Sequence, residues 1–148
     1  MKLSNAEKRL LRFLYDWIRP IRPGDIKKHI NVKHSTLNFQ LETLQKKKLL
    51  TWEKYGPVSL TKQGRKVASH HLRHVALLEL FLMETLALDK ELAHRESMTV
   101  APLIDCRVAE AIDSFLKNPQ SSSCCGKIPP EEVCRANERI EGSSEDVP

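Results

Sequence analysis

The chain has 148 residues and a mass of 17.0 kDa, enough for one domain or two very small ones. Hydrophobic residues make up 41% and charged residues 29%, as in soluble globular proteins, and no apolar run approaches the roughly 18 residues of a membrane span. Only 5% of the residues are aromatic and 5 are glycine, which disfavours an all-β sandwich or barrel. The first residues also lack the apolar segment and cleavage site of a secretory signal. We therefore expect a mainly helical, cytoplasmic protein that makes no use of a membrane.

Charge is divided unevenly between the two halves of the chain. Residues 1–68 hold 16 Lys or Arg against 5 Asp or Glu, a net charge of +11, whereas residues 69–148 hold 8 against 14, a net charge of −6. Basic segments attract nucleic acids because phosphate contacts release condensed counterions. A solvated basic surface would show the same charge. The first half is a candidate for DNA binding, and the acidic second half must have another role.

Apolar spacing and turn residues in the first half predict helices followed by a hairpin. In chain order, the expected elements are a helix over 5–18 capped by Ser4 or Asn5, a short helix over 25–30, a helix over about 35–47, a hairpin over 49–60 with its turn at 55–57, and a long helix that starts after Thr61 and continues to about Leu86.

The second half predicts two more helices, over about 89–98 and 104–117. Residues 119–148 contain 4 of the 8 prolines and few large apolar side chains, which predicts an acidic tail that is flexible or loosely docked. We thus expect a DNA-binding domain over 1–68, a helical dimerisation domain over 69–118 and a tail over 119–148.

Two short helices followed by a third with small polar residues at its start are typical of a helix-turn-helix. The hydroxyls of Ser35 and Thr36 suit a phosphate, Asn38 and Gln40 suit adenine, and Phe39 suits a thymine methyl group. The candidate DNA-contacting residues also include the approach to this helix, its basic end and the hairpin tip, and are Lys33, His34, Ser35, Thr36, Asn38, Phe39, Gln40, Lys46, Lys47, Lys54 and Tyr55. The alternative is a polar surface helix in which Phe39 belongs to the core.

Several runs resemble the diphtheria-toxin-repressor family of iron- and manganese-dependent transcription regulators. Residues 32–38 resemble the start of the family's recognition helix, and residues 53–65 resemble its wing and linker helix. The likeness continues through residues 77–82, 86–89 and 126–129, and so spans roughly 5–130. The resemblance implies a mainly α fold, with an N-terminal winged helix-turn-helix, a helical dimerisation domain and no SH3-like domain. It also implies a repressor that binds DNA as a homodimer.

The resemblance further implies a site for Mn²⁺ or Fe²⁺, most of whose ligand positions are altered here. The first-helix positions fall near Arg9 and Arg12, which are cations and cannot coordinate a metal, and the expected Glu-His pair is replaced by Ala101 and Pro102. The candidates that remain are His74, Glu79, His94, Glu96 and Met98. A reduced site with weakened or lost metal response is one interpretation. In the others, the histidines are ordinary surface or interface residues, or a salt bridge from Arg9 or Arg12 to Glu79 or Glu96 replaces the metal.

Four cysteines, at positions 106, 124, 125 and 134, all lie in the second half. Their spacing contains no Cys-x-x-Cys pair, so it does not by itself indicate structural zinc. Cys124, Cys125 and Cys134 are candidates for thiol sensing or for binding a soft metal, and the alternative is that they are incidental reduced thiols.

An apolar stripe along residues 65–86, together with the apolar helix over 104–116, offers more apolar surface than a small monomer can bury. This predicts a homodimer, which would match a near-palindromic operator in double-stranded DNA. Two alternatives to a repressor with residual metal response remain open. One is a regulator that responds to redox state or a soft metal through its cysteines, and the other is a winged-helix adaptor that binds another protein. An enzyme is not expected, because the sequence shows no paired carboxylates, no nucleophile beside a base and no Gly-rich phosphate loop.

Overall fold

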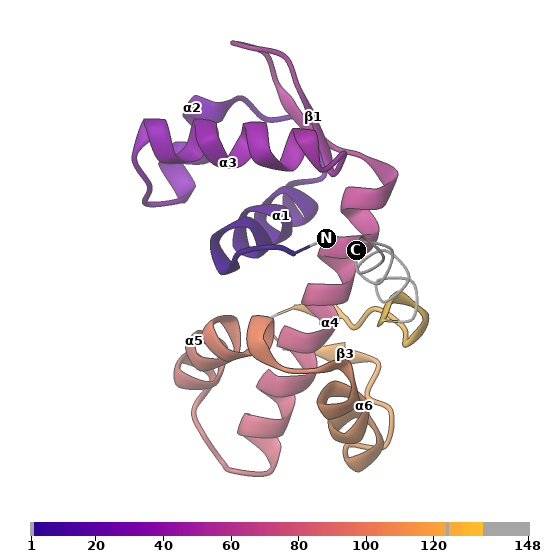
Figure 1. Cartoon of the computed structure of the whole chain (residues 1–148). Coiled ribbons are helices and arrows are strands. Elements are labelled where there is room, and N and C mark those ends of the chain that lie inside the picture. The colour runs from indigo at the N-terminus through magenta and orange to yellow at the C-terminus, as the bar shows by residue number, and fades with distance from the viewer. Residues whose placement is uncertain (1, 124, 135–148) are drawn as a thin grey trace. The chain divides into compact units, whose positions relative to one another are not determined.

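The computed structural model describes residues 2–123 and 125–134, and the chain divides into two compact units (Figure 1). Unit 1 extends to Ala68 and unit 2 begins at Ser69. The described part is mainly helical, with two small two-stranded sheets, and none of its helices is both long and apolar enough to pass through a bilayer. The predicted predominance of helix is confirmed.

Unit 1 contains the three short helices, the hairpin and the first turns of a long helix in the predicted order. Its elements are α1 (Asn5–Trp17), α2 (Pro23–His29), α3 (His34–Lys46), β1 (Leu50–Trp52), β2 (Val58–Leu60) and the beginning of α4 (Lys62–Glu84). Ser4 caps α1, as predicted: its hydroxyl accepts from the Glu7 amide, and the Glu7 carboxylate accepts from the Ser4 amide. Thr61 likewise accepts a hydrogen bond from the Gly64 amide at the start of α4.

The core of unit 1 is formed by leucines and isoleucine from the three short helices. Leu10 and Leu11 of α1, Ile26 of α2, and Leu37, Leu41 and Leu44 of α3 are almost completely buried. The hairpin is antiparallel, with Leu50 opposite Leu60 and Trp52 opposite Val58. It packs beside α3 and α1, so the three helices and the hairpin share one core that fixes the orientation of α3.

Gly64 lies in the first turn of α4, where this helix meets the backbone of Leu49, the residue directly before β1. A Cβ atom at this position would lie 1.8 Å from the carbonyl oxygen of Leu49, closer than any real contact. The same carbonyl accepts from the Thr61 amide. The absence of a side chain at Gly64 thus allows the hairpin and α4 to join closely.

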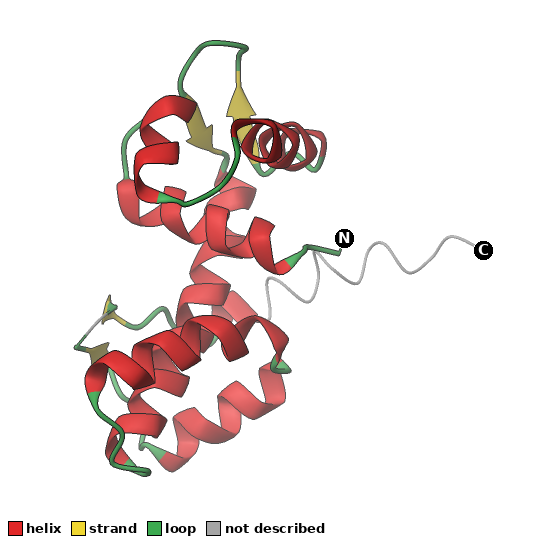
Figure 2. Cartoon of the chain, turned by 90° about the vertical axis from the view of Figure 1, so that its left-hand side faces the viewer, coloured by secondary structure: helices red, strands yellow, loops and turns green. Residues whose placement is uncertain are grey.

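Unit 2 is built around the second half of α4. Its other elements are α5 (Lys90–Val100), the 3₁₀ turn η1 (Ala101–Leu103), α6 (Cys106–Phe115) and the strand pair β3 (Ser121–Ser122) and β4 (Gly126–Lys127) (Figure 2). Asp89 and Asp105 cap α5 and α6 by accepting amide hydrogen bonds. The observed ends of the helices lie within a few residues of the predicted ones, and α4 ends at Glu84, shortly before Ala87 at φ 54°.

One expectation about unit 2 is narrowed by the structure. Residues after 118 were expected to form a flexible or loosely docked tail, and in the described part Ser122, Ile128 and Cys134 are buried and β3 pairs with β4. Ile128 belongs to the same core as Leu77 of α4, so sparse apolar residues are enough to dock this segment. Residues 135–148 lie outside the described part.

The apolar stripe of residues 65–86 is only partly covered. Val67, Leu72, Val75 and Leu77 are buried, whereas Leu78, Phe81 and Leu82 are half-buried and Leu86 is exposed. Further large apolar side chains of unit 2 are exposed at Val100, Leu103, Val108 and Phe115, the last two on α6.

Candidate nucleic-acid interface and metal-ligating centres

The first turns of α3 present polar side chains to solvent. Ser35 and Thr36 are exposed, and Lys33, the N-cap residue, makes no side-chain hydrogen bond to the first turn. Asn38 is half-buried one turn further along. Phe39 is 69% exposed, so the alternative that placed it in the core is wrong. Because Leu37 and Leu41 fill the core, the helix must turn these intervening residues outward.

A groove of about 980 Å³ lies between α2, α3 and the hairpin. Its lining includes four basic side chains, Arg22, Lys28, His34 and Lys54, together with Asn38 of α3. Two acidic residues, Asp25 and Glu42, also line it, and the Asp25 carboxylate accepts from Lys28 at 3.0 Å. The groove therefore combines a net positive lining with one of the candidate base-reading side chains.

Lys54 and Tyr55, at the tip of the hairpin, are exposed to solvent. Tyr55 is 85% exposed and adopts φ 67°, and the ammonium of Lys54 lies 5.5 Å from its ring centre. An exposed aromatic ring beside a cation can contact a sugar-phosphate backbone at the edge of a groove.

Lys47 does not share the exposed setting of its neighbour Lys46. Its ammonium lies 2.9 Å from Oε1 of the buried Glu7 and donates to the carbonyl of Lys2 at 2.8 Å. Lys47 was expected to contribute to a DNA-binding cluster, but its charge is neutralised inside unit 1. Lys46 is exposed.

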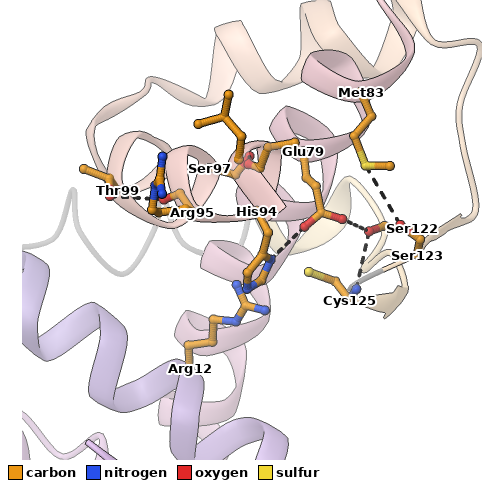
Figure 3. A network of polar contacts seen from close by, with 12 residues as sticks. Arg12, Glu79, Met83, His94, Arg95, Ser97, Thr99, Ser122, Ser123 and Cys125 are labelled. Carbon is orange, nitrogen blue, oxygen red and sulfur yellow. Dashed lines mark hydrogen bonds and ion pairs between the residues drawn. The ribbon is translucent and has the colours of Figure 1, made fainter. Parts of the chain in front are cut away.

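Unit 2 places Glu79 at the centre of a polar network (Figure 3). Glu79 is completely buried, its Oε2 lies 2.8 Å from Nδ1 of His94, and its Oε1 accepts from the Ser122 hydroxyl at 2.8 Å. The thiol of Cys125 lies near these groups, so one carboxylate oxygen, one imidazole nitrogen and one sulfur fall within 4.8 Å of one another. Such a set could hold a transition metal.

The five candidate metal ligands do not form one site. Glu79 and His94 lie together, whereas His74 belongs to a different group. Glu96 is exposed and lies 3.6 Å from Arg95, and among the histidines, cysteines and acidic residues of the described part it joins no ligand cluster. Of the two first-helix cations, Arg12 lies 3.7 Å from Asp16, within unit 1.

The other group consists of two histidines and two cysteines. Nε2 of His70 lies 3.1 Å from Sγ of Cys106, and Nε2 of His74 lies 3.5 Å from Sγ of Cys134. The four donor atoms all lie within 4.8 Å of one another. Burial raises the pKa of the Cys134 thiol, while its hydrogen bond with Cys106 and the nearby Arg73 act in the opposite direction.

His70 and Cys106 were not among the residues singled out from the sequence. His70 and His74 are four residues apart in a helix, a spacing that puts both on one face and was a usable signal. Cys106 and Cys134 carry no such signal, because only the tertiary fold brings them to α4. Of the thiol-sensing candidates, Cys125 and Cys134 fall in separate groups, and Cys124 lies outside the described residues.

Comparisons with known proteins show that the chain is similar to regulators of transcription. Residues 61–130 match the family model of the iron dependent repressor, metal binding and dimerisation domain. An uncharacterised HTH-type transcriptional regulator of Methanocaldococcus jannaschii is 24% identical over 110 residues, which cover 74% of this chain and 88% of that protein. These relatives are regulators of transcription and not enzymes.

Solved structures agree in fold. The manganese regulator SloR is 24% identical with a TM-score of 0.76 over 88% of this chain and 61% of its own. A manganese-dependent transcriptional repressor in complex with manganese is 24% identical with a TM-score of 0.78 over 85% and 59%. The chain spans about three fifths of the length of these two proteins. The predicted resemblance to the diphtheria-toxin-repressor family is supported by the family model over residues 61–130, and these two structures show the same fold.

Proposed function

We propose that the protein is a sequence-specific transcription regulator, acting as a repressor, whose unit 1 is a winged helix-turn-helix that binds double-stranded DNA. The observation that carries this proposal is the surface of α3, where Ser35, Thr36 and Phe39 are exposed in a segment with a net charge of +11. The helix order, the hairpin and the fold shared with solved repressors support the same assignment.

Different residues of α3 contact the phosphates and the bases of the DNA. Ser35 and Thr36, with the uncapped amides of the first turn, bind a phosphate, and Lys46 and Lys54 contact flanking phosphates. Asn38 and Gln40 accept and donate at adenine edges, while Phe39 packs against a thymine methyl group. His34 and Lys33 lie at the start of the same helix and Tyr55 at the hairpin tip, where they position the protein on the duplex.

The homodimer is formed by unit 2. Val108 and Phe115 are exposed and lie seven residues apart on α6, which places them on one face of the helix. Leu103, just before α6, is also 69% exposed. Large exposed apolar side chains at helical spacing are typical of an interface, and a two-fold dimer would match a near-palindromic operator.

The response to Mn²⁺ or Fe²⁺ is weakened. Glu79 and His94 supply one oxygen and one nitrogen donor, but the third donor within reach is the sulfur of Cys125. Mn²⁺ prefers oxygen ligands, and a thiolate suits softer metals. Arg9 and Arg12 are cations and provide no ligands to complete an octahedral coordination shell around the metal. The Glu79 group therefore fits Mn²⁺ poorly.

Binding of the full chain to labelled duplex DNA, followed by fluorescence anisotropy over a series of salt concentrations, tests the proposal. We expect affinity to fall steeply with salt, and Lys54→Ala to reduce the slope by about one unit because one phosphate contact is lost. Lys90→Ala, an exposed lysine of unit 2, is the control with the same charge change. Salt-independent binding, or equal slopes for both variants, would favour a protein-binding adaptor.

The base-reading role has its own test. Replacing Asn38 and Phe39 together by alanine is expected to reduce binding to a selected operator by tenfold or more, while binding to unrelated duplex DNA changes little. An equal loss on both DNAs would show that these residues do not read the sequence.

A further inference from the structure

The His70, His74, Cys106 and Cys134 side chains form a group distinct from the Glu79 network in unit 2. They come from three places in the fold, since the two histidines lie on α4, Cys106 is the first residue of α6, and Cys134 lies after β4. His70, His74 and Cys134 are buried, and Cys106 is half-buried. The group is thus enclosed on the sides formed by α4 and the C-terminal segment.

The donor distances are close to those of a tetrahedral metal centre. With metal–sulfur bonds near 2.3 Å and metal–nitrogen bonds near 2.0–2.1 Å, neighbouring ligand atoms of a tetrahedron lie roughly 3.3–3.8 Å apart. The separation of 3.5 Å between His74 Nε2 and Cys134 Sγ lies within this range, and that of 3.1 Å between His70 Nε2 and Cys106 Sγ lies just below it. Small side-chain shifts would bring all four donors, now within 4.8 Å of one another, to coordinating distance.

The charges also fit. Two thiolates neutralise one divalent cation, so a buried complex with two neutral imidazoles carries no net charge. Arg73, a cation whose charge acts on the Cys134 thiol, is balanced by Asp113, whose Oδ2 lies 3.2 Å from the guanidinium. Arg73 also donates to the carbonyl of Pro129 at 3.0 Å, which holds the segment that leads to Cys134 against α4.

We propose that His70, His74, Cys106 and Cys134 bind a single thiophilic divalent ion of the zinc class in tetrahedral geometry, fastening the segment that ends at Cys134 to α4 and α6. A donor set of two sulfurs and two nitrogens selects Zn²⁺ over Mn²⁺, which prefers oxygen. Because four protein ligands close the coordination shell, the ion has a structural role and leaves no position for a substrate. This inference goes beyond the proposed function, and its test requires no DNA.

Titration of the reduced, metal-free full chain with Co²⁺ tests the site directly, since cobalt reports geometry and thiolate ligation by its absorption. The expected result is one Co²⁺ per chain, with the intense visible bands of tetrahedral cobalt and a near-ultraviolet thiolate charge-transfer band. One equivalent of Zn²⁺ should displace the cobalt, and excess Mn²⁺ should not. A weak octahedral spectrum, or no binding with the thiols reduced, would overturn the proposal.

Variants locate the ion. Cys134→Ser and Cys106→Ser should each weaken the charge-transfer band, whereas Cys124→Ser, the control with the same chemical change, should leave it unchanged. Cys125→Ser, in the Glu79 network, tests whether that network holds the cobalt instead. If the signal is lost in Cys125→Ser and persists in Cys106→Ser and Cys134→Ser, the metal is bound by the Glu79 network, and the inference is refuted. If Cys134→Ser fails to fold, Cys106→Ser decides, because its position at the half-buried start of α6 tolerates serine.

Thermal unfolding gives an independent measurement. Zn²⁺ should raise the melting temperature of the wild-type protein and of Cys124→Ser, and should have no effect on Cys106→Ser. An equal rise in all three proteins would show that zinc stabilises the chain elsewhere and would contradict the proposed site.

Discussion

The hydroxyl of Ser122 donates a hydrogen bond to Oε1 of Glu79 at 2.8 Å, although the two residues are 43 positions apart. Glu79 is completely buried in α4, and Ser122 is buried in β3. A buried carboxylate must be compensated by hydrogen bonds or opposite charge, and Ser122 and His94 provide that compensation. The segment after residue 118 therefore completes the environment of a charged group in unit 2.

Replacing Ser122 by alanine should lower the free energy of unfolding by about 1–3 kcal/mol, because it removes a hydrogen bond from a buried carboxylate. Chemical denaturation followed by circular dichroism measures the effect. Ser123→Ala is the matched control, since Ser123 is exposed and its hydroxyl lies 4.0 Å from the sulfur of Met83. Equal stability of the two variants would show that Ser122 is not needed to keep Glu79 buried.

Substitutions at two adjacent lysines should have different effects: Lys47→Ala should lower stability, and Lys46→Ala should weaken DNA binding. Lys47→Ala leaves the carboxylate of the buried Glu7 without its ammonium partner and should cost about 1–3 kcal/mol of folding free energy. Lys46→Ala should leave stability within about 0.5 kcal/mol and weaken DNA binding, because Lys46 is exposed. Denaturation and anisotropy on both variants check this, and the reverse pattern would contradict the assignment of Lys47 as a structural residue.

Gly64→Ala should destabilise unit 1 strongly, because the new methyl group would lie 1.8 Å from the Leu49 carbonyl oxygen unless the hairpin moves. We expect a loss of more than about 2 kcal/mol, as for other overpacked sites. Gly24→Ala is the control, since a methyl group at position 24 would have no atom within 4 Å and alanine is the better helix former. A Gly64→Ala protein as stable as the wild type would show that α4 can move away from β1 at little cost.

The oligomeric state should depend on the exposed face of α6. Introducing glutamate at both Val108 and Phe115 places charge in an apolar contact and should convert a dimer to a monomer without loss of secondary structure. Sedimentation velocity measures the change. Glutamate at Phe39, which is equally exposed but belongs to unit 1, is the control and should leave the dimer intact. A dimer that survives the α6 variant would have its interface elsewhere.

Much of the fold could be predicted because local signals are strong in the first half. Ser4 and Glu7 form a capping box, Thr61 caps α4, and the turn residues at 55–57 sit between two short β-rich runs. Each of these signals acts over a few residues, so sequence alone locates them. The leucines of α3 likewise repeat at helical spacing, and they are buried as that spacing predicts.

Long-range relationships were harder to predict. Nothing in the sequence near Lys47 shows that its partner is Glu7, 40 positions earlier. Composition suggested a flexible or loosely docked segment after residue 118, because it contains few large apolar residues, yet Ile128 and Cys134 are buried. The pairing of His70 with Cys106 and of His74 with Cys134 depends on the packing of three elements, which cysteine spacing does not encode.

The central claim, that this protein binds particular DNA sequences with little need for Mn²⁺ or Fe²⁺, is tested most directly by selection from fragmented genomic DNA. The purified full chain is incubated with the fragments in two arms, one containing a chelator and the other Mn²⁺ or Fe²⁺, and the retained fragments are sequenced. We predict that the same small set of fragments, sharing a near-palindromic motif, is enriched in both arms. Enrichment only in the metal arm, or no specific fragment in either arm, would contradict the account.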